Sequence, residues 1–564
     1  MEAITAPVSW AHIGFHVIVG LHNTPFIPGL VLGRIRVCYR QFRGNIQFYK
    51  MMAVRLGRGA RSLLQTSSRR PAVRYKASLG VSPVRVDHGG RLKTIDDLPG
   101  PSQLESLYWI LLRGYIFYMH ELEVKLKKKY GPMWVWNIGD HRLVSIASPQ
   151  LLEALLKQEG KYPMRADINL WKEHRDLRGY PYGPLTEEGH QWQTQRSALN
   201  QKMLKPTDAA HYADSLNEII PDLFNKIEEV RAQSPSGHMV ENIAGLMYKF
   251  AFESISTVIF ETRLGCLSKD IPEENQKFIN SITIMLESQS VLERLPRWAW
   301  GWLPYWGRFL ESWDIIFNYA TKLINKKKAD IEERLQSGDD LGGAYLTHLL
   351  TSGNLDMKGI YGALPEMLQA GVDTTSNTLT WVLYQLAKNP EAQQSLYEEV
   401  TRVIPGDTIP GTDDISKMPL LKAVIKETLR MYPVVPENGR VTVEKEVVLD
   451  GYIFPKNTQF LLCHYVLSRD ESSFPDPDRF LPRRWLRSEG IRHHPFSSIP
   501  FGFGVRGCLG RRVAELEMHL VLSQLIRRFQ VLPDPKLGDV NPKNRVVLVP
   551  QRPINLQFID RKKN

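Results

Sequence analysis

The chain has 564 residues and a mass of 64.7 kDa, with 43% hydrophobic, 23% charged and 10% aromatic residues. This is the composition of a globular protein, and it excludes a disordered, collagen-like or low-complexity chain. The four cysteines, Cys38, Cys266, Cys463 and Cys508, include no CxxC pair. A disulfide scaffold is therefore excluded, and a structural zinc site is disfavoured.

The net charge of +12 is carried by the N-terminal region. Residues 1–93 contain 15 Arg and Lys and only two acids, whereas the rest of the chain is almost neutral. Nucleic-acid-binding proteins spread basic residues over a folded face, so this distribution argues against a nucleic-acid partner. Residues 51–83 combine Arg and Ser with no acid, which is typical of a mitochondrial transit peptide; a disordered basic tail is the alternative. Met51 and Met52 are alternative starts, which leaves the status of residues 1–50 open.

Residues 94–564 are expected to form one large, mainly α-helical domain with a minor β part. Most of residues 102–430 carry helical periodicity of apolar residues, and no Gly/Ser-rich linker interrupts them. Short strand-like segments stand out in the sequences MWVWNIG, RLVSIAS, EVVLDGYIF and TQFLLCHY.

The segment PFGFGVRGCLGRRVAELEMHL, residues 500–520, carries the most specific signal. Its glycines match GxGxxG, but prolines break the preceding segment and no acid stands about 20 residues further on, which excludes a dinucleotide site. The same glycines surround Cys508 at the start of an expected helix, residues 509–525. Unpaired N–H groups and the helix dipole there are expected to lower the pKa of the thiol. Arg506 supplies a cation for an acidic group on a ligand.

A planar ligand with carboxylates, an iron that takes one thiolate and a cradle of glycines together describe haem. The pattern fixes Phe501, Gly504, Arg506, Cys508 and Gly510, and such a match seldom arises by chance. It resembles the haem-binding loop of the cytochrome P450 superfamily, and the resemblance extends from about Leu98 to the C-terminus. It implies the P450 fold, haem b with the Cys508 thiolate as axial ligand, and a monooxygenase that places one oxygen atom of O₂ in its substrate.

Three more residues are expected to form a structural core beside this ligand. Glu427 and Arg430 form an ExxR motif one helical turn apart, so they can pair. Arg484, in FPDPDRFLPRRW, can join them as in the Glu–Arg–Arg core of the P450 family. We interpret this trio as a scaffold rather than as catalytic groups.

Partners for the haem propionates should be cations or N–H donors. Trp192 and Arg196 stand four residues apart in EEGHQWQTQR and match the W-x-x-x-R motif of the family. Arg440, which follows PVVPENG, is the third candidate. An ordinary packed Trp–Arg pair is the alternative interpretation of the first two.

Asp373 and Thr374 place an acid beside an alcohol in QAGVDTTSNTLTW, midway along an apolar stretch from Lys358 to Ala387. If this helix crosses the distal face of the haem, the pair can order water and supply protons during oxygen activation. We therefore expect both residues to be catalytic. A buried Asp whose bonds are satisfied locally is the alternative.

No flavin or nicotinamide motif is visible, so the electrons must come from another protein. Segments such as ALNQKMLKP and MPLLKAVIKETLRMYPVVP resemble the mitochondrial sterol 27-hydroxylase (sterol 26-hydroxylase) family. The resemblance implies an adrenodoxin-type [2Fe–2S] ferredoxin with its reductase, and a peripheral place on the matrix side of the inner mitochondrial membrane. The expected ferredoxin site consists of Lys422, Lys426, Arg511 and Arg512.

Residues 295–313 hold five of the 13 tryptophans, which favours contact with the headgroup region of a bilayer; packed core aromatics are the alternative. The resemblance implies that this segment covers the substrate entrance and that the side chain of cholesterol or of a bile-acid intermediate is hydroxylated. Three other functions remain open: a vitamin D or retinoid hydroxylase of the same group, an isomerase or dehydratase on the same fold, and a non-catalytic membrane-associated adaptor.

Overall fold

The structure, a computed structural model, describes residues 92–561 except 139–140, 167 and 296. These residues lie in a compact unit that starts at residue 83. The predicted transit peptide and residues 1–50 lie outside the described residues. The predicted fold class, mainly α with a minor β part, is confirmed.

Long helices make up most of the described chain. They are α10 (Ile220–Ala232), α11 (Ile243–Phe260), α12 (Glu273–Leu292), α13 (Pro304–Ser337), α15 (Met357–Lys388), α16 (Pro390–Val403), α18 (Pro419–Met431) and α20 (Arg511–Arg528). Shorter helices are α3 (Gln103–Leu107), α4 (Met119–Tyr130), α5 (Pro149–Leu156), α6 (Asn169–Arg178), α7 (Gly189–Leu199), α8 (Pro206–Ala210), α9 (Ala213–Asn217), α14 (Tyr345–Thr351), α17 (Thr412–Ser416) and α19 (His464–Ser468). Short 3-10 or π-helical segments are η1 (Ile95–Asp97), η2 (Tyr108–Leu112), η3 (Tyr115–Phe117), η4 (Arg297–Trp302), η5 (Pro482–Trp485), η6 (Arg487–Glu489) and η7 (Gly504–Arg506).

The strands form four small sheets. Their bounds are β1 (Met133–Ile138), β2 (His141–Ile146), β3 (Met239–Val240), β4 (Asn438–Val441), β5 (Val447–Leu449), β6 (Tyr452–Phe454), β7 (Gln459–Leu462), β8 (Phe529–Pro533), β9 (Pro542–Arg545), β10 (Val547–Pro550) and β11 (Leu556–Asp560). The largest sheet has the order β1-β2-β7-β4, in which only the β2–β7 pair is parallel and Leu143 faces Gln459. The other sheets are β3-β11-β8, the hairpin β9–β10 and the hairpin β5–β6.

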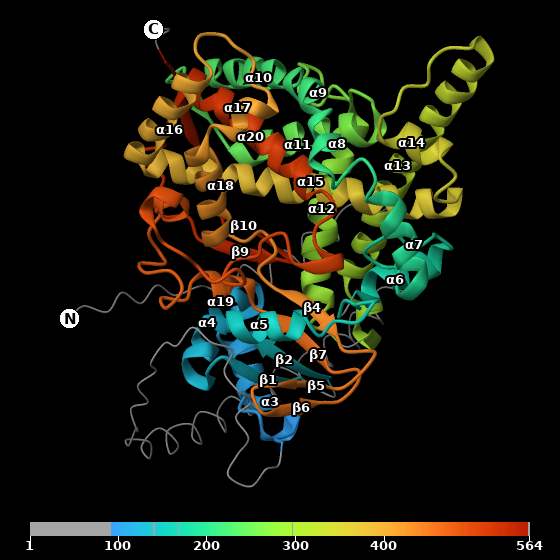
Figure 1. Ribbon diagram of the computed structural model, residues 1–564, viewed down its shortest axis with the longest axis vertical. Coiled ribbons are helices and arrows are strands. Elements are labelled where there is room, and N and C mark those ends of the chain that lie inside the picture. The colour runs from blue at the N-terminus through green and yellow to red at the C-terminus, as the bar shows by residue number, and fades with distance from the viewer. Residues whose placement is uncertain (1–91, 139–140, 167, 296, 562–564) are drawn as a thin grey trace, which may run out of the picture. The chain divides into compact units, whose positions relative to one another are not determined.

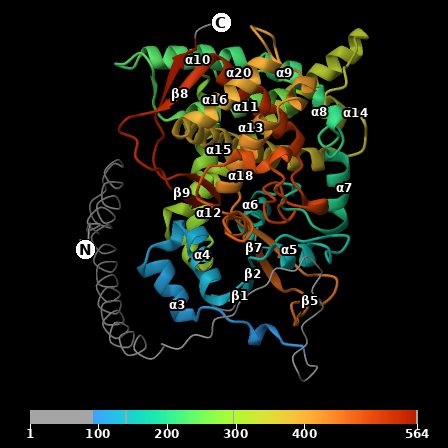
Figure 2. The same cartoon turned by 60° about the vertical axis from the view of Figure 1, so that its left-hand side comes forward.

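The sheet β1-β2-β7-β4 and most of the helices occupy opposite ends of the described unit (Figures 1 and 2). One hydrophobic core joins the long helices, and a smaller one joins the strands to α5. Helix α15 runs through the helical part and is buried along most of its length. Its Gly371 packs so closely on α11 that an added Cβ would lie 2.7 Å from Ile255 Cγ1. The helical core therefore holds α15 in a fixed position.

Helix α11 is the one helix in the described residues that is long and apolar enough to cross a membrane. Its 18 residues have a mean hydropathy of 1.3, and 78% of them are buried inside the molecule. Helix α15 and others cover it, so its apolar character is explained by its place in the core.

Candidate active site

Cys508 lies in a tight loop between η7 and α20. The Cys508 N–H donates to Phe501 O at 2.7 Å, and the Gly507 N–H donates to Gly504 O at 3.0 Å, so the loop folds back on itself. Gly502 and Gly504 have φ values of 72° and 67°, a conformation that favours glycine. The sulfur is therefore presented from a backbone that only a glycine-rich sequence forms easily.

The Cys508 side chain has solvent-accessible surface, yet burial raises the pKa of its thiol above the ordinary value of 9.0. Both observations hold if the sulfur faces an internal hollow. The Gly510 N–H and the charges of Arg196 and Arg165 lower this pKa by less than burial raises it. The predicted lowering of the pKa is therefore wrong, because α20 begins only at Arg511 and desolvation dominates. A coordinating metal deprotonates a thiol outright, so ligation itself can supply the thiolate.

Four arginines from separate segments converge beside this loop. They are Arg165, Arg196 on α7, Arg440 on β4 and Arg506 on η7. Burial, followed by the charges of neighbouring arginines, lowers the pKa of Arg165 to about 10 and that of Arg506 to about 9. Among the described residues, the carboxylate that pairs with one of the four arginines is that of Glu159, which accepts from Arg440 Nε at 2.6 Å. The arginine cluster therefore carries excess positive charge in a buried place.

One donor of the arginine cluster and one of the neighbouring Trp192 have no acceptor among the described residues. Trp192 Nε1 and Arg165 Nε are both buried without a hydrogen-bond partner. Arg196 Nη2 donates to Gly507 O at 2.6 Å, which ties α7 to the loop of Cys508. Buried cations and unpaired donors beside an accessible sulfur fit a ligand that carries carboxylates and a thiolate-binding metal. The propionates and the iron of haem meet this description.

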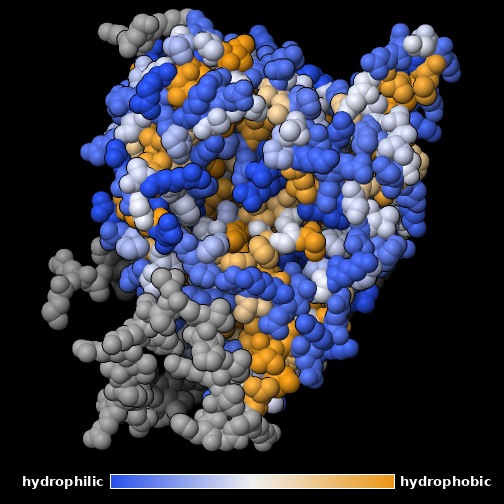
Figure 3. Space-filling model, in the orientation of Figure 1, coloured by the Kyte–Doolittle hydropathy of each residue, from blue (hydrophilic) through white to orange (hydrophobic). Residues whose placement is uncertain are grey.

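Helix α15 presents one accessible face inside the molecule. Met367, Ala370 and Thr374 retain accessible surface, whereas most residues around them on α15 are buried. They stand at i, i+3 and i+7, so they lie on the same side of the helix. Figure 3 shows a hollow lined by hydrophobic residues in the middle of the face drawn, between the helices and the strands. These three residues therefore form one accessible side of a helix that is otherwise mostly buried.

Asp373 and Thr374 make separate hydrogen bonds. Asp373 Oδ1 accepts from Arg545 Nη2 at 2.9 Å and from the Tyr248 hydroxyl, whereas Oδ2 is buried without a partner in the described chain. Burial raises the pKa of Asp373. Thr374 Oγ1 donates to Ala370 O at 2.8 Å. The acid is thus held by two groups that sequence reasoning missed, and only the alcohol shows accessible surface.

Glu427, Arg430 and Arg484 come together at the end of α18. Arg430 donates to both carboxylate oxygens of Glu427 at 2.9 Å, and Arg484 Nε donates to Oε1 at 3.1 Å. Trp485 Nε1 adds a further bond to Glu427 Oε2 at 2.9 Å. These side chains fasten the segment that follows α19 to α18, and removing one partner would leave a buried charge unpaired, at a cost of about 3–5 kcal/mol.

The four residues predicted to bind a ferredoxin lie on α18 and α20, which pack together. Lys426 is exposed and Lys422 half-buried, and in the described chain neither pairs with a carboxylate. Arg511 and Arg512 are exposed but share Glu515, at 3.0 and 3.4 Å. The unpaired charge of this surface therefore belongs mainly to the two lysines.

The tryptophans of residues 295–313 have different environments. Trp298 and Trp302 on η4 are 78% and 84% exposed, whereas Trp313 is fully buried beneath the Arg175 guanidinium, 3.7 Å from its ring centroid. Trp300 is half-buried and donates to Leu292 O at 3.1 Å. The expectation of a headgroup-facing segment therefore stays a prediction for η4, and it is wrong for Trp313, which packs in the core.

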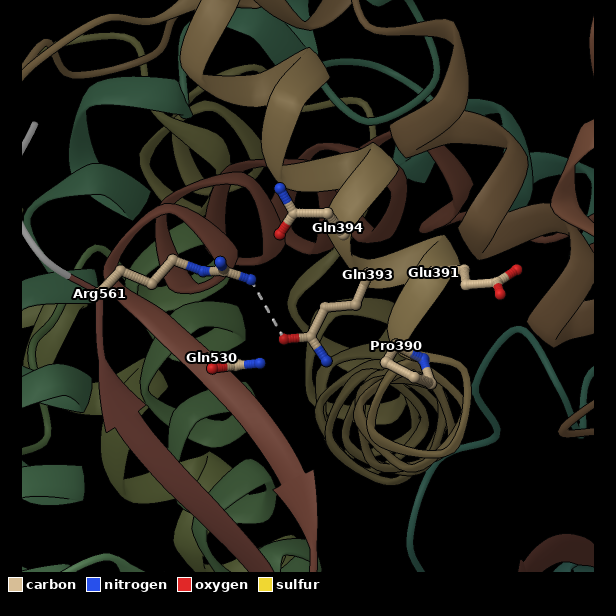
Figure 4. Close-up of a pocket in the computed structure, with 6 residues that line it drawn as sticks. All are labelled: Pro390, Glu391, Gln393, Gln394, Gln530 and Arg561. Carbon is tan, nitrogen blue, oxygen red and sulfur yellow. Dashed lines mark hydrogen bonds between the residues drawn. The ribbon is translucent and has the colours of Figure 1, made fainter.

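A surface pocket of about 470 Å³ lies at the start of α16 (Figure 4). Its lining residues are Pro390, Glu391, Gln393, Gln394, Gln530 and Arg561. Arg561 Nη2 donates to Gln393 Oε1 at 3.4 Å across it. None of the residues singled out by sequence lines this pocket, and it holds no cysteine, so we do not assign the chemistry to it.

Sequence reasoning missed several groups of the site. Arg165 ends the segment GKYPMR, which resembles the sterol 27-hydroxylase family but suggests no role for the arginine, and Tyr248 and Arg545 lie 125 and 172 residues from Asp373, which they bind. His464 is buried with Nδ1 unpartnered in the described chain, and burial and the charge of Arg440 lower its pKa to about 4. Only a three-dimensional structure brings such residues together.

Fold and site together define a haem-thiolate protein with Cys508 as the thiolate ligand. The cytochrome P450 family model matches residues 99–558, so the chain belongs to the cytochrome P450 family. The predicted family, monooxygenase class and haem cofactor are confirmed.

The relatives of this chain include several mitochondrial hydroxylases. It is 49% identical over 479 residues to the mitochondrial sterol 26-hydroxylase of Rattus norvegicus, covering 84% of this chain and 90% of that protein. Identity to the human sterol 26-hydroxylase is 48% over 478 residues, with the same coverage. The human mitochondrial 25-hydroxyvitamin D-1 alpha hydroxylase is 42% identical over 87% of this chain and 97% of that protein.

Proposed function

We propose that this cytochrome P450 hydroxylates the side chain of sterols such as cholesterol and bile-acid intermediates. The observation that carries the proposal is the 49% identity to a protein named sterol 26-hydroxylase, which is covered over 90% of its length. The apolar hollow beside α15 is consistent with a large lipid substrate. The second candidate function is hydroxylation of 25-hydroxyvitamin D, because the match to the 25-hydroxyvitamin D-1 alpha hydroxylase covers 97% of that protein.

The bound haem supplies oxygen activation: one atom of O₂ enters a C–H bond and the other leaves as water. The chain's own residues perform the remaining tasks. The arginine cluster and Trp192 hold the propionates, and Cys508 provides the sulfur ligand. Thr374 orders water on the accessible face of α15, and Asp373, fixed by Arg545 and Tyr248, is the buried acid that stands next to it in the chain.

Electrons come from an adrenodoxin-type [2Fe–2S] ferredoxin that docks on α18 and α20. Lys422 and Lys426 present positive charge without carboxylate partners in the described chain, which suits an acidic protein. Residues 51–83 serve as the transit peptide of the 1–93 region and direct the 94–564 domain to the mitochondrial matrix. The relatives' names include the word mitochondrial, which supports this location in the cell.

The enzyme binds the inner membrane peripherally, with Trp298 and Trp302 in the headgroup region. Leu104, Leu107 and Leu112 on α3 and η2 are also exposed, at 49–58%. Figure 3 shows hydrophobic residues gathered at the lower end of the face drawn, where Figure 1 places α3. Changing both tryptophans to Ser should weaken cosedimentation with cardiolipin-containing vesicles. The matched change of the exposed Leu335 and Ile409 to Ser should leave it unaltered.

Reconstitution with purified ferredoxin, its reductase and NADPH tests the function. We expect a sterol hydroxylated on its side chain, identified by mass spectrometry, to form only when all components are present. Parallel incubations with 25-hydroxyvitamin D and retinol decide between the proposed substrates. A haem-loaded protein that oxidises none of the sterols would contradict the proposal.

A further inference from the structure

Helix α20 begins with two arginines, a position that a helix disfavours for cations. Arg511 and Arg512 are its first two residues, and its first turn contains no acid. The unpaired N–H groups of a helix start carry partial positive charge, so they repel a cation there. Glu515 follows about one turn later, which is also the less favourable order for an Arg–Glu pair on a helix. The sequence therefore places two cations where the helix itself gives no reason for them.

Glu515 binds both arginines at the same time. Its Oε1 accepts from Arg511 Nε at 3.0 Å, and its Oε2 accepts from Arg512 Nη1 at 3.4 Å. In the described chain, Glu515 is the carboxylate with which each of the two arginines pairs. The side chains of Arg511 and Arg512 are 48% and 44% exposed. A docked protein can therefore reach both guanidinium groups, and one shared carboxylate leaves net positive charge on them.

The two arginines connect the sulfur-bearing loop with the lysines of α18. Arg511 Cζ lies 5.4 Å from the ring centroid of Phe501, which belongs to that loop. Helix α20 packs on α18, which carries Lys422 and Lys426. Burial, followed by the charges of Lys422 and Lys426, lowers the pKa of His519, two turns after Arg511 on α20, so both lysines lie near this helix. One partner protein can therefore contact the arginines and the lysines together.

A ferredoxin has to bind and leave this surface more than once in each catalytic cycle. Placing one oxygen atom of O₂ in a C–H bond and reducing the other to water consumes two electrons and two protons. A [2Fe–2S] ferredoxin delivers one electron at a time, so two reduced ferredoxins dock in turn. A surface that holds its partner too tightly delays this exchange. An internal competitor for the same cations weakens the complex and avoids the delay.

We propose that Glu515 is a positioning residue that competes with an acidic side chain of the ferredoxin for Arg511 and Arg512. It holds both arginines while the surface is empty, and a docking carboxylate displaces it. The inference rests on the proposed ferredoxin surface and adds its regulation: Glu515 keeps the affinity for ferredoxin low enough for rapid exchange. Exposed ion pairs are weak, so their partners exchange readily, which suits such a competition.

The dissociation constant of oxidised ferredoxin tests the inference, measured on the haem-loaded full chain by surface plasmon resonance. Glu515→Gln keeps the size of the side chain and frees both arginines, so it should lower the dissociation constant about 3- to 10-fold. In a background in which Arg511 and Arg512 are both changed to Gln, the same substitution should have almost no effect. Glu333→Gln, which changes an exposed acid on α13, alters the net charge equally and should leave the constant unchanged.

Ferredoxin binding that is unchanged or weaker in Glu515→Gln would overturn the inference. An equal gain in the background without the two arginines would do the same, because net charge alone would then explain it. Lys422→Glu with Lys426→Glu separates the inference from the proposed function. If this pair weakens ferredoxin binding while Glu515→Gln changes nothing, the docking surface stands and only the inference fails. If neither alters binding, the docking surface fails and the inference fails with it.

Discussion

The guanidinium of Arg506 lies over the Trp192 ring, with 3.7 Å between Cζ and the ring centroid. This pair joins η7, next to Cys508, to α7, which carries Arg196. Arg506 is also held by backbone oxygens, with Nε donating to Pro163 O at 2.7 Å. The stack therefore fixes a cation and leaves the Trp192 Nε1 donor free for a ligand. It unites the propionate site with the loop that carries the sulfur.

Trp192→Phe tests this arrangement because it keeps the aromatic ring and removes only the N–H donor. A hydrogen bond to a charged group contributes about 1.5–3 kcal/mol, so haem should be lost about 10- to 100-fold faster. The measurement is the rate of haem transfer to an excess of an apo-acceptor protein. Trp134→Phe is the matched control, since Trp134 Nε1 is also buried without a partner but lies in another core. Equal rates for the two variants would contradict the role of Trp192.

Thr374→Ala tests the water-ordering role on α15. The variant loses only the hydrogen bond to Ala370 O, so the fold and the haem should be retained. We expect NADPH consumption to continue while product per NADPH falls several-fold, with hydrogen peroxide or water formed instead. Thr378→Ala is the control, because Thr378 makes the same bond to Thr374 O one turn further along the helix. Fully coupled turnover in Thr374→Ala would contradict the proton-delivery role.

Sequence alone predicted the parts of the site that are local or belong to a specific motif. The periodicity of residues 358–387 gave nearly the observed bounds of α15, and the spacing of Glu427 and Arg430 placed them on one side of α18. The glycine pattern marked Cys508 because the loop needs residues with positive φ. Five of the strands, β1, β2, β5, β6 and β7, lie in the four short strand-like segments.

What sequence could not predict depends on burial and on contacts between distant segments. Tyr248 and Arg545 reach Asp373 only through the packing of α11 and β9 against α15. The thiol pKa was predicted with the wrong sign, because desolvation by the surrounding fold exceeds the local effect of the helix start. Trp313 was grouped with exposed tryptophans because a sequence window does not show which side of α13 faces the core.

Charge reversal tests the ferredoxin-binding surface. Lys422→Glu combined with Lys426→Glu should raise the apparent KM for ferredoxin about 10-fold and leave the sterol dissociation constant unchanged, because the lysines attract an acidic partner. Increasing ionic strength should affect the wild type more than the variant. Lys277→Glu with Lys326→Glu, two exposed lysines on α12 and α13, makes the same change in net charge elsewhere. A KM unaffected by the first pair, or raised equally by the second, would refute this docking surface.

His519 on α20 should make the fold sensitive to acid. Burial, and then the charge of Lys422, lowers its pKa from 6.5 to about 4. Between these two values the unfolded chain binds a proton that the folded protein excludes, so stability from this group is present above about pH 6.5 and falls as the pH drops. At pH 5 the loss amounts to about 2 kcal/mol.

His519→Gln removes that titration. Thermal unfolding of both proteins at pH 7.5 and pH 5 measures the effect: acidification should lower the midpoint of the wild type more than that of the variant. If the difference between the two midpoints is the same at both pH values, His519 does not titrate as its burial requires.

The bond between sulfur and iron is tested most directly by the absorption spectrum of the reduced, carbon-monoxide-bound protein in three forms. Wild type and Cys266→Ala, which removes a buried thiol away from the loop, should both show the red-shifted band of a thiolate-ligated haem. Cys508→Ala should lose this band even when haem is still bound through the arginine cluster. A red-shifted band that survives in Cys508→Ala would show that another residue holds the iron.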